Sequence, residues 1–126
     1  ARGQVSTARE LRALAGAALA RVEFARRIAL PRATLATASG RQMEIASTNA
    51  LLGRVEGVRG VKTGTTLRGG ECVIALAERE GHQVVVVLLG AKDRWWTAAA
   101  LIEAAFREAR AGTLGSRGAA SVPASR

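Results

Sequence analysis

The run from Val84 to Leu89 constrains the fold most, because it consists of six aliphatic residues in succession. A strand with one face in water alternates apolar and polar residues, and this run does not alternate. It predicts a strand over 83–89 that is covered on both faces and lies in the interior of its sheet. We therefore expect a layered α/β fold, in which an antiparallel sheet packs against the first and last helices of the chain.

Four further strands are expected, two short ones that form a hairpin around the Ser39-Gly40 turn signal and two longer ones. Their ranges are 34–37, 42–46, 58–66 and 71–78. Arg79-Glu80-Gly81-His82 joins the last of these to 83–89 and predicts a tight turn. Between the short hairpin and the next strand, residues 49–53 are expected to form one irregular helical turn.

Helices are expected at both ends of the chain. Thr7 and Glu10 have the spacing of a capping box, which predicts a helix over 8–21 and a further helical turn over 23–28. Pro31 ends this stretch, and Asp93 is expected to cap the last helix. The expected buried stripes are Leu11, Leu14, Ala15, Ala18, Leu19 and Val22 in the first helix and Trp95, Ala98, Ala99, Ile102, Phe106 and Ala109 in the last.

Composition excludes several classes of protein. The 126 residues suffice for one domain, and 48% of them are apolar, which favours a globular chain. The formal net charge of +9 would suit a nucleic acid, but the cations are spread from Arg2 to Arg126 without interleaved aromatic residues, so no nucleic-acid partner is expected. No apolar run reaches the length of a membrane span. The single cysteine, Cys72, excludes a disulfide within the chain.

The candidate site is the run Gly60-Val61-Lys62-Thr63-Gly64-Thr65-Thr66. It predicts a strand whose outer end presents an ammonium and a hydroxyl side by side. The ammonium can hold an anion, and the hydroxyl can donate and accept hydrogen bonds. Gly64 lets a ligand approach the backbone closely, and the N–H groups beyond it can stabilise an oxyanion. An exposed strand end with a turn would explain the same residues without any function.

The surrounding sequence resembles the serine D-Ala-D-Ala carboxypeptidases, the low-molecular-mass penicillin-binding proteins, over roughly residues 5–108. The matching runs occur in the family's order. They are Ser6-Thr7-Ala8-Arg9-Glu10-Leu11, Ser47-Thr48-Asn49-Ala50-Leu51-Leu52, Val58–Thr66, Gly69-Gly70-Glu71-Cys72, Leu88-Leu89-Gly90-Ala91 and Arg94. The resemblance implies part of a β-lactamase/DD-peptidase-like fold. It also implies acyl transfer on peptidoglycan stem peptides that end in D-Ala-D-Ala, β-lactam antibiotics as ligands of the intact protein, no cofactor, and a cell-envelope location that is periplasmic or otherwise extracytoplasmic.

The resemblance implies substrate-binding roles for six residues. Lys62 would support the reacting centre and the terminal carboxylate of the substrate, and Thr63 would hydrogen-bond that carboxylate. Gly64 would keep the strand open, so that a peptide can lie along it. The backbone N–H of Thr65 would be one oxyanion donor. Thr66 would line the wall of the site, and Arg94 would help to hold the carboxylate.

The same family uses a Ser-x-x-Lys nucleophile motif and an upstream Ser-x-Asn motif. This chain has no Ser-x-x-Lys, so we expect no catalytic residue in it and no activity of the chain alone. Ser47-Thr48-Asn49 spells Ser-x-Asn, but it lies only thirteen residues before Lys62, and a turn capped by its own side chains explains it better.

The remaining chemically active residues are expected to be structural. His82 is expected to be solvated in its turn, and Cys72 is expected to be a small core residue. Of Trp95 and Trp96, one is expected on the core stripe of the last helix and the other at its rim, although the pair could also flank a sugar. No cluster of His, Cys and carboxylates suggests a metal.

We expect residues 1–111 to be the C-terminal part of a catalytic domain and 112–126, rich in Gly, Ser, Ala and Pro, to be a disordered tail or linker. Because the chain begins at Ala1 and not at Met, it is expected to begin within a longer protein. Two alternatives remain open: a truncated or degenerate relative that binds D-Ala-ended peptides without cleaving them, and a β-lactamase fragment. Membrane attachment is also open.

Overall fold

The computed structural model describes residues 3–112. Three helices and five strands follow one another along them. They are α1 (Ala8–Leu19), α2 (Val22–Ile28), β1 (Arg32–Ala36), β2 (Gln42–Ala46), β3 (Val58–Thr66), β4 (Gly70–Arg79), β5 (His82–Ala91) and α3 (Arg94–Arg110). The tail expected over 112–126 lies, apart from Gly112, outside the described residues.

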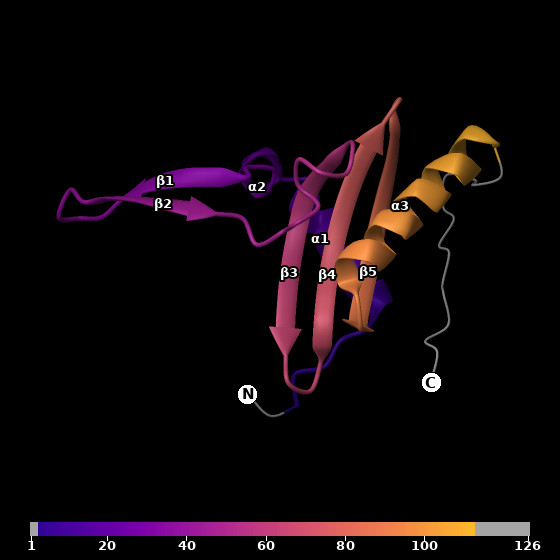
Figure 1. Cartoon of the computed structure of the whole chain (residues 1–126), viewed down its shortest axis with the longest axis horizontal. Coiled ribbons are helices and arrows are strands. Elements are labelled where there is room, and N and C mark those ends of the chain that lie inside the picture. Colours follow the sequence, from indigo (N-terminus) through magenta and orange to yellow (C-terminus); the bar gives the residue numbers. More distant parts are fainter. Residues whose placement is uncertain (1–2, 113–126) are drawn as a thin grey trace.

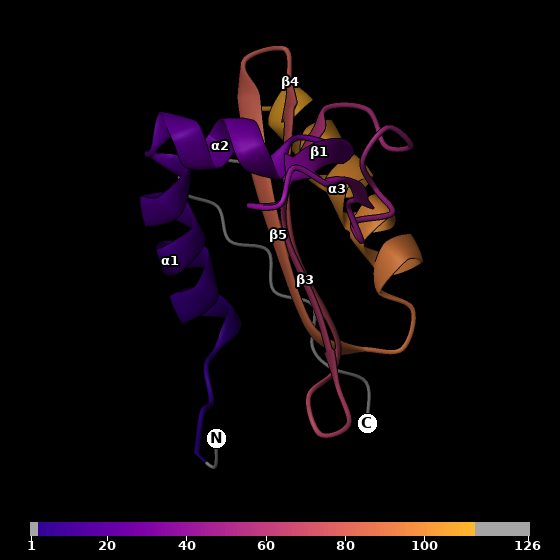
Figure 2. The same ribbon diagram turned by 90° about the vertical axis from the view of Figure 1, so that its left-hand side faces the viewer.

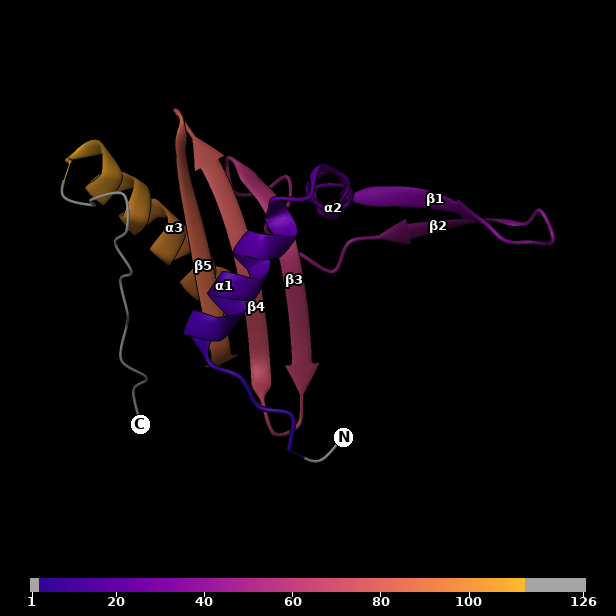
Figure 3. The ribbon, with the colours of Figure 1, turned by 180° about the vertical axis from the view of Figure 1, so that it is seen from behind.

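A three-stranded antiparallel sheet in the order β3-β4-β5 forms the body of the molecule. Helix α3 lies across one face of this sheet and α1 across the other (Figures 1 and 3), and the two helices stand on opposite sides of it when the sheet is seen edge-on (Figure 2). This arrangement confirms the expected α/β fold with an antiparallel sheet between the first and last helices. The separate β1–β2 hairpin projects away from the sheet (Figure 1).

The prediction that 83–89 lies in the interior of its sheet was wrong for the described residues. Strand β5 is the end strand of the three-stranded sheet, and β4 is the central one. Both α1 and α3 contact β5, so the expectation of cover on both faces is confirmed. The apolar run reflects the helices that pack on both faces of β5. A strand can be covered on both faces without having a hydrogen-bonded strand on each side.

The core lies between the sheet and α3. The central strand supplies Val73, Ala75 and Ala77, which are at most 1% exposed, and α3 supplies Ile102 and Phe106. The small residues of β4 let the helix approach the sheet, and the large side chains of α3 fill the space. The expected stripe on α3 is confirmed, since Ala98, Ile102 and Phe106 are buried and Trp95, Ala99 and Ala109 are partly buried.

The stripe expected on the first helix was only partly right. Ala15 is buried, but Leu14 is 65% exposed and Val22 is 71% exposed. The helix ends at Leu19 and a second helix begins at Val22, so that Val22 no longer continues the face that touches the sheet. Helical spacing predicted the α1 helix correctly but not which of its apolar residues would be covered.

Local signals at the ends of the elements are confirmed. Thr7 Oγ1 accepts from the Glu10 backbone N–H, and the Glu10 carboxylate accepts from the Thr7 N–H. These bonds lower the pKa of Glu10, the bond from the Thr7 backbone contributing most. Asp93 caps α3 by accepting from Trp96 N. Glu80 and Gly81 both have positive φ, as a two-residue hairpin turn requires.

An ion pair between Arg79, the last residue of β4, and Glu103 joins the sheet to α3. The Arg79 guanidinium donates to both carboxylate oxygens of Glu103 and to the main-chain oxygen of Glu56, and it lies 4.7 Å from the centre of the Phe106 ring. The Arg79 side chain is 11% exposed. Its hydrogen bonds to Glu103 lower the pKa of that carboxyl below its ordinary value of 4.5.

We therefore expect acid to weaken the fold through this pair. A carboxyl whose pKa is lowered by folding contributes stability that is complete above about pH 4.5 and is lost as the pH falls through the folded-state pKa. Glu103 is about half exposed, so its share should stay below about 1 kcal/mol. Urea unfolding between about pH 7 and about pH 3 should show this loss in the parent chain and not in Glu103→Gln. A Glu103→Gln profile equal to that of the parent would contradict the expectation.

Candidate functional site

Strand β3 presents the candidate site along an open edge. It pairs with β4 on one side, and no strand of the described residues pairs with its other side. The register places Thr63 opposite Val73 and Lys62 opposite Ile74. A strand edge without a partner can receive an extended peptide through main-chain hydrogen bonds, with side-chain specificity supplied by its flanks.

The side chains of Lys62 and Thr63 lie on opposite faces of the sheet. Consecutive side chains of a strand alternate, and Thr63 shares the α3 face with its cross-strand partner Val73, which belongs to the core beneath α3. Lys62 is exposed, and its ammonium donates to the main-chain carbonyl of Thr63. The ammonium and the hydroxyl therefore flank the strand, instead of standing together on one face of it.

Glycine at position 60 determines how β3 enters the sheet. Gly60 is buried with φ near +138°, and the pairing of β3 with β4 shifts register between Val58 and Gly60. A Cβ atom at this position would lie 2.7 Å from Cδ1 of Ile28 in α2. Helix α2 thus packs directly on the backbone at the start of the site. This contact sets the position of Lys62, two residues further along β3.

The turn before β3 has the geometry expected for Ser47-Thr48-Asn49. Asn49 N donates to Ser47 Oγ at 3.2 Å, and Leu51 N donates to Asn49 Oδ1 at 3.1 Å. Asn49 is 7% exposed and Leu51 is 3% exposed. The expected side-chain-capped turn is confirmed, and it is anchored in the core. The turn also brings Thr48 to the site, where its Oγ1 lies 2.7 Å from Thr63 Oγ1. The sequence alone did not indicate this contact.

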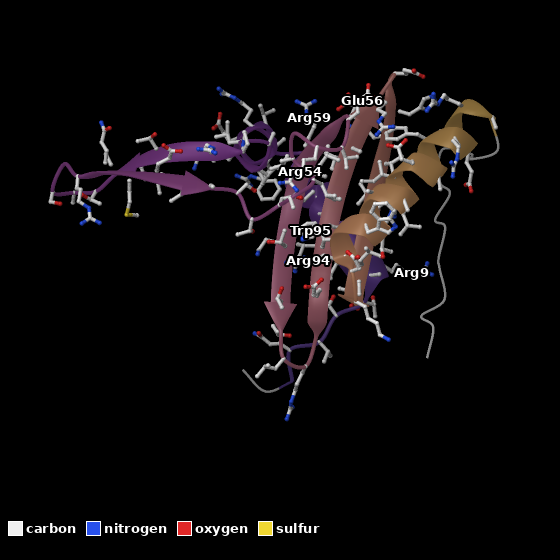
Figure 4. The ribbon with its side chains drawn as sticks, in the orientation of Figure 1. Arg9, Arg54, Glu56, Arg59, Arg94 and Trp95 are labelled. Atoms are coloured by element: carbon white, nitrogen blue, oxygen red, sulfur yellow. The ribbon has the colours of Figure 1, made fainter. Side chains whose placement is uncertain are left out.

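Arg94 reaches the end of the same strand from the first turn of α3. Its Nη1 donates to Gly64 O at 2.8 Å and to Thr65 Oγ1 at 2.7 Å. The guanidinium also lies 4.4 Å from the centre of the Trp95 ring (Figure 4). Its Nε is buried and has no partner among the described residues. Arg94 thus contacts Gly64 and Thr65 directly, and its role in holding a substrate carboxylate stays a prediction.

Other residues singled out in the sequence take structural places. Thr66 Oγ1 accepts from Gly69 N at 2.8 Å and closes the β3–β4 turn. His82 is exposed at the first residue of β5, and Cys72 is half-buried, not fully in the core. Trp95 packs on the core while Trp96 is 78% exposed, as expected of a core residue and its neighbour at the rim.

Two hollows border the sheet, and neither is lined by Lys62 or Thr63. One, of about 220 Å³, lies between α2, the hairpin and Val61. The other, of about 410 Å³, lies between α1 and the sheet around Leu76. Residues 3–112 bring together no group of His, Cys, Asp or Glu side chains that could hold a metal ion. None of the helices described is long and apolar enough to cross a membrane.

Solved structures similar to this one include a DD-transpeptidase and a penicillin-binding protein. The Streptomyces K15 DD-transpeptidase matches with a TM-score of 0.74 and 26% identity, over 81% of this chain and 42% of its own length. Penicillin-binding protein D2 from Listeria monocytogenes, solved with bound ampicillin, matches with a TM-score of 0.70 and 32% identity, over 84% of this chain and 44% of its own length. The chain thus spans less than half of each of these proteins and has the fold of the corresponding part.

Residues 1–93 match the family model of D-alanyl-D-alanine carboxypeptidases, and the chain belongs to that family. No protein among the curated sequences matches it. The family membership confirms the resemblance inferred from the ordered motifs around Lys62-Thr63-Gly64.

Proposed function

We propose that this chain is the part of a serine D-Ala-D-Ala carboxypeptidase that supplies the Lys-Thr-Gly wall of the active site. The intact enzyme would remove the terminal D-Ala from peptidoglycan stem peptides through an acyl-enzyme, in the cell envelope, and would bind β-lactams. The observation that carries the proposal is the edge of β3 that no strand within residues 3–112 pairs with, on a strand that bears Lys62-Thr63-Gly64 in a chain of this family.

The positions of four site residues support the roles proposed for them. A substrate peptide would lie along the open edge of β3, where Gly64 has no atom within 4 Å of the place a Cβ would occupy. The hydroxyl of Thr63 and the charge of Lys62 would hold the terminal carboxylate from the two flanks of the strand. Arg94 would add positive charge at the end of the strand, and the Thr65 N–H would face the developing oxyanion.

The nucleophile of the reaction would come from polypeptide that this sequence does not contain. Its only lysines are Lys62 and Lys92, and the residues three positions before them are Arg59 and Leu89, so the 126 residues hold no Ser-x-x-Lys. Acyl transfer needs an activated hydroxyl. The chain by itself should therefore bind a peptide and not cleave it, which also leaves a purely binding relative as the second candidate function.

Lys62→Ala tests the proposed site in the chain as it stands. An acetylated L-Lys-D-Ala-D-Ala peptide should shift the backbone amide NMR signals of β3, and Lys62→Ala should weaken its affinity about tenfold, because a charge-assisted bond to the carboxylate is lost. Lys92→Ala removes the other lysine and should leave the affinity unchanged. Equal losses in the two variants, or no shift with the parent chain, would overturn the proposed site.

Labelling with a fluorescent penicillin separates the enzyme from the binding relative. A form of the protein that carries a Ser-x-x-Lys together with these residues should give a covalent adduct, and the 126-residue chain should give none. Release of D-Ala from the same peptide should follow the adduct. If the longest form encoded with this sequence neither labels nor releases D-Ala, the binding role remains and the carboxypeptidase proposal fails.

A further inference from the structure

The contact between Thr48 and Thr63 is not explained by the turn or by the sheet alone. It joins two side chains that are 15 residues apart, one in the turn before β3 and one in the middle of the site strand. Its 2.7 Å separation is that of a good hydroxyl–hydroxyl hydrogen bond. Thr48 itself is held in place, because the next residue, Asn49, is buried and caps the turn with its side chain.

The chemistry of two hydroxyls limits what each can do. A hydroxyl has one proton, so in this pair one threonine donates and the other accepts. If Thr48 donates to Thr63 Oγ1, the single proton of Thr63 stays free for a second partner. If Thr63 donates to Thr48, it has no proton left to give. An ionised carboxylate accepts only, so a ligand of that kind selects the arrangement in which Thr48 is the donor.

We propose that Thr48 is a positioning residue of the site, whose hydroxyl donates to Thr63 Oγ1 and thereby directs the Thr63 proton toward the terminal carboxylate of the ligand. This inference rests on the proposed function and deepens it. It assigns the preference for a free carboxylate in part to a residue outside the Lys-Thr-Gly run. Thr48 does not touch the ligand and acts only through Thr63.

Three variants separate positioning from support of the turn. Thr48→Val keeps the shape and removes the hydroxyl, whereas Thr48→Ser keeps the hydroxyl. Thr37→Val is the matched control, because Thr37 Oγ1 makes a comparable 2.9 Å contact with Ser39 Oγ in the hairpin between β1 and β2. Each variant of the full chain is titrated by NMR with acetylated L-Lys-D-Ala-D-Ala and with the same peptide as its C-terminal amide, and its stability is measured by urea unfolding.

Thr48→Val should weaken binding of the free-carboxylate peptide about three- to tenfold, as the loss of one oriented hydrogen bond predicts. Binding of the amide should change by less than about twofold, since an amide terminus can itself donate to an unoriented hydroxyl. Thr48→Ser and Thr37→Val should retain the parent affinity for both peptides.

Parent affinity for the carboxylate peptide in Thr48→Val would overturn the positioning role. So would an equal loss for both peptides, which is the result expected if Thr48 only supports the turn. If the parent chain binds neither peptide, the proposed function fails, and the role of Thr48 fails with it. Binding that depends on Lys62 but not on Thr48 would overturn this inference alone.

Discussion

Replacing Phe106 with alanine is expected to lower the free energy of unfolding by about 3–5 kcal/mol, the usual cost of removing a buried phenylalanine ring. Phe106 is 2% exposed in the core between α3 and the sheet, and its ring also lies beneath the Arg79 guanidinium. The core residues that β4 contributes include Ala75 and Ala77, whose side chains are too short to fill the cavity. Urea unfolding followed by circular dichroism measures the loss.

Phe24, the other phenylalanine of the chain, provides the matched control. It lies half-buried on α2, so Phe24→Ala should cost about half as much or less. Phe106→Leu keeps most of the volume and should lose less than about 2 kcal/mol. Equal costs for the two Phe→Ala variants would show that the core is not centred between α3 and the sheet.

Gly60→Ala is expected to destabilise the fold by about 2–4 kcal/mol, from two causes that add. Residues with a side chain rarely adopt the φ of +138° that Gly60 has. The new methyl would also lie 2.7 Å from Ile28 Cδ1 and 3.2 Å from Ile28 Cβ, and because side-chain rotation does not move Cβ, it cannot fully relieve the contact. Peptide binding should weaken too, since this glycine sets the position of β3.

Gly64→Ala is the control for this prediction, because it adds the same methyl to the same strand. Nothing lies within 4 Å of the new Cβ atom, and no positive φ opposes it, so stability should change by less than about 1 kcal/mol. It should still weaken peptide binding if the ligand lies along this part of β3. Adding Ile28→Ala to Gly60→Ala should recover the steric part of the loss and not the conformational part. A Gly60→Ala chain as stable as the parent would contradict the expected strain.

Features carried by neighbouring residues could be predicted from the sequence. The Thr7–Glu10 capping box, the Asp93 cap and the Glu80-Gly81 turn each depend on a few adjacent residues, and all three formed as expected. The limits 58–66 of the site strand were predicted to the residue. Such patterns predict local structure because the hydrogen bonds that they form join residues a few positions apart and do not depend on what packs around them.

Features that join distant residues could not be predicted. Nothing in the sequence near Thr48 indicates a bond to Thr63, and nothing near Arg79 indicates a pair with Glu103, 24 residues away. The place of β5 at the end of the sheet that the described residues form was missed for the same reason, since an apolar run indicates what packs on the faces of a strand and not which strands pair with its edges. The expectation that Lys62 and Thr63 stand side by side neglected the alternation of side chains along β3.

The sequence by itself determined the family and the layered α/β class of this protein, together with the strand that bears Lys62-Thr63-Gly64. Order along the chain and local hydrogen bonding suffice for these. Only the tertiary structure decided that no other strand of residues 3–112 pairs with its second edge, that Lys62 and Thr63 lie on opposite faces, and that the hydroxyl of Thr48 reaches it from another element. The physical reason is that side-chain contacts between separate elements depend on packing through the core, which no short stretch of residues encodes.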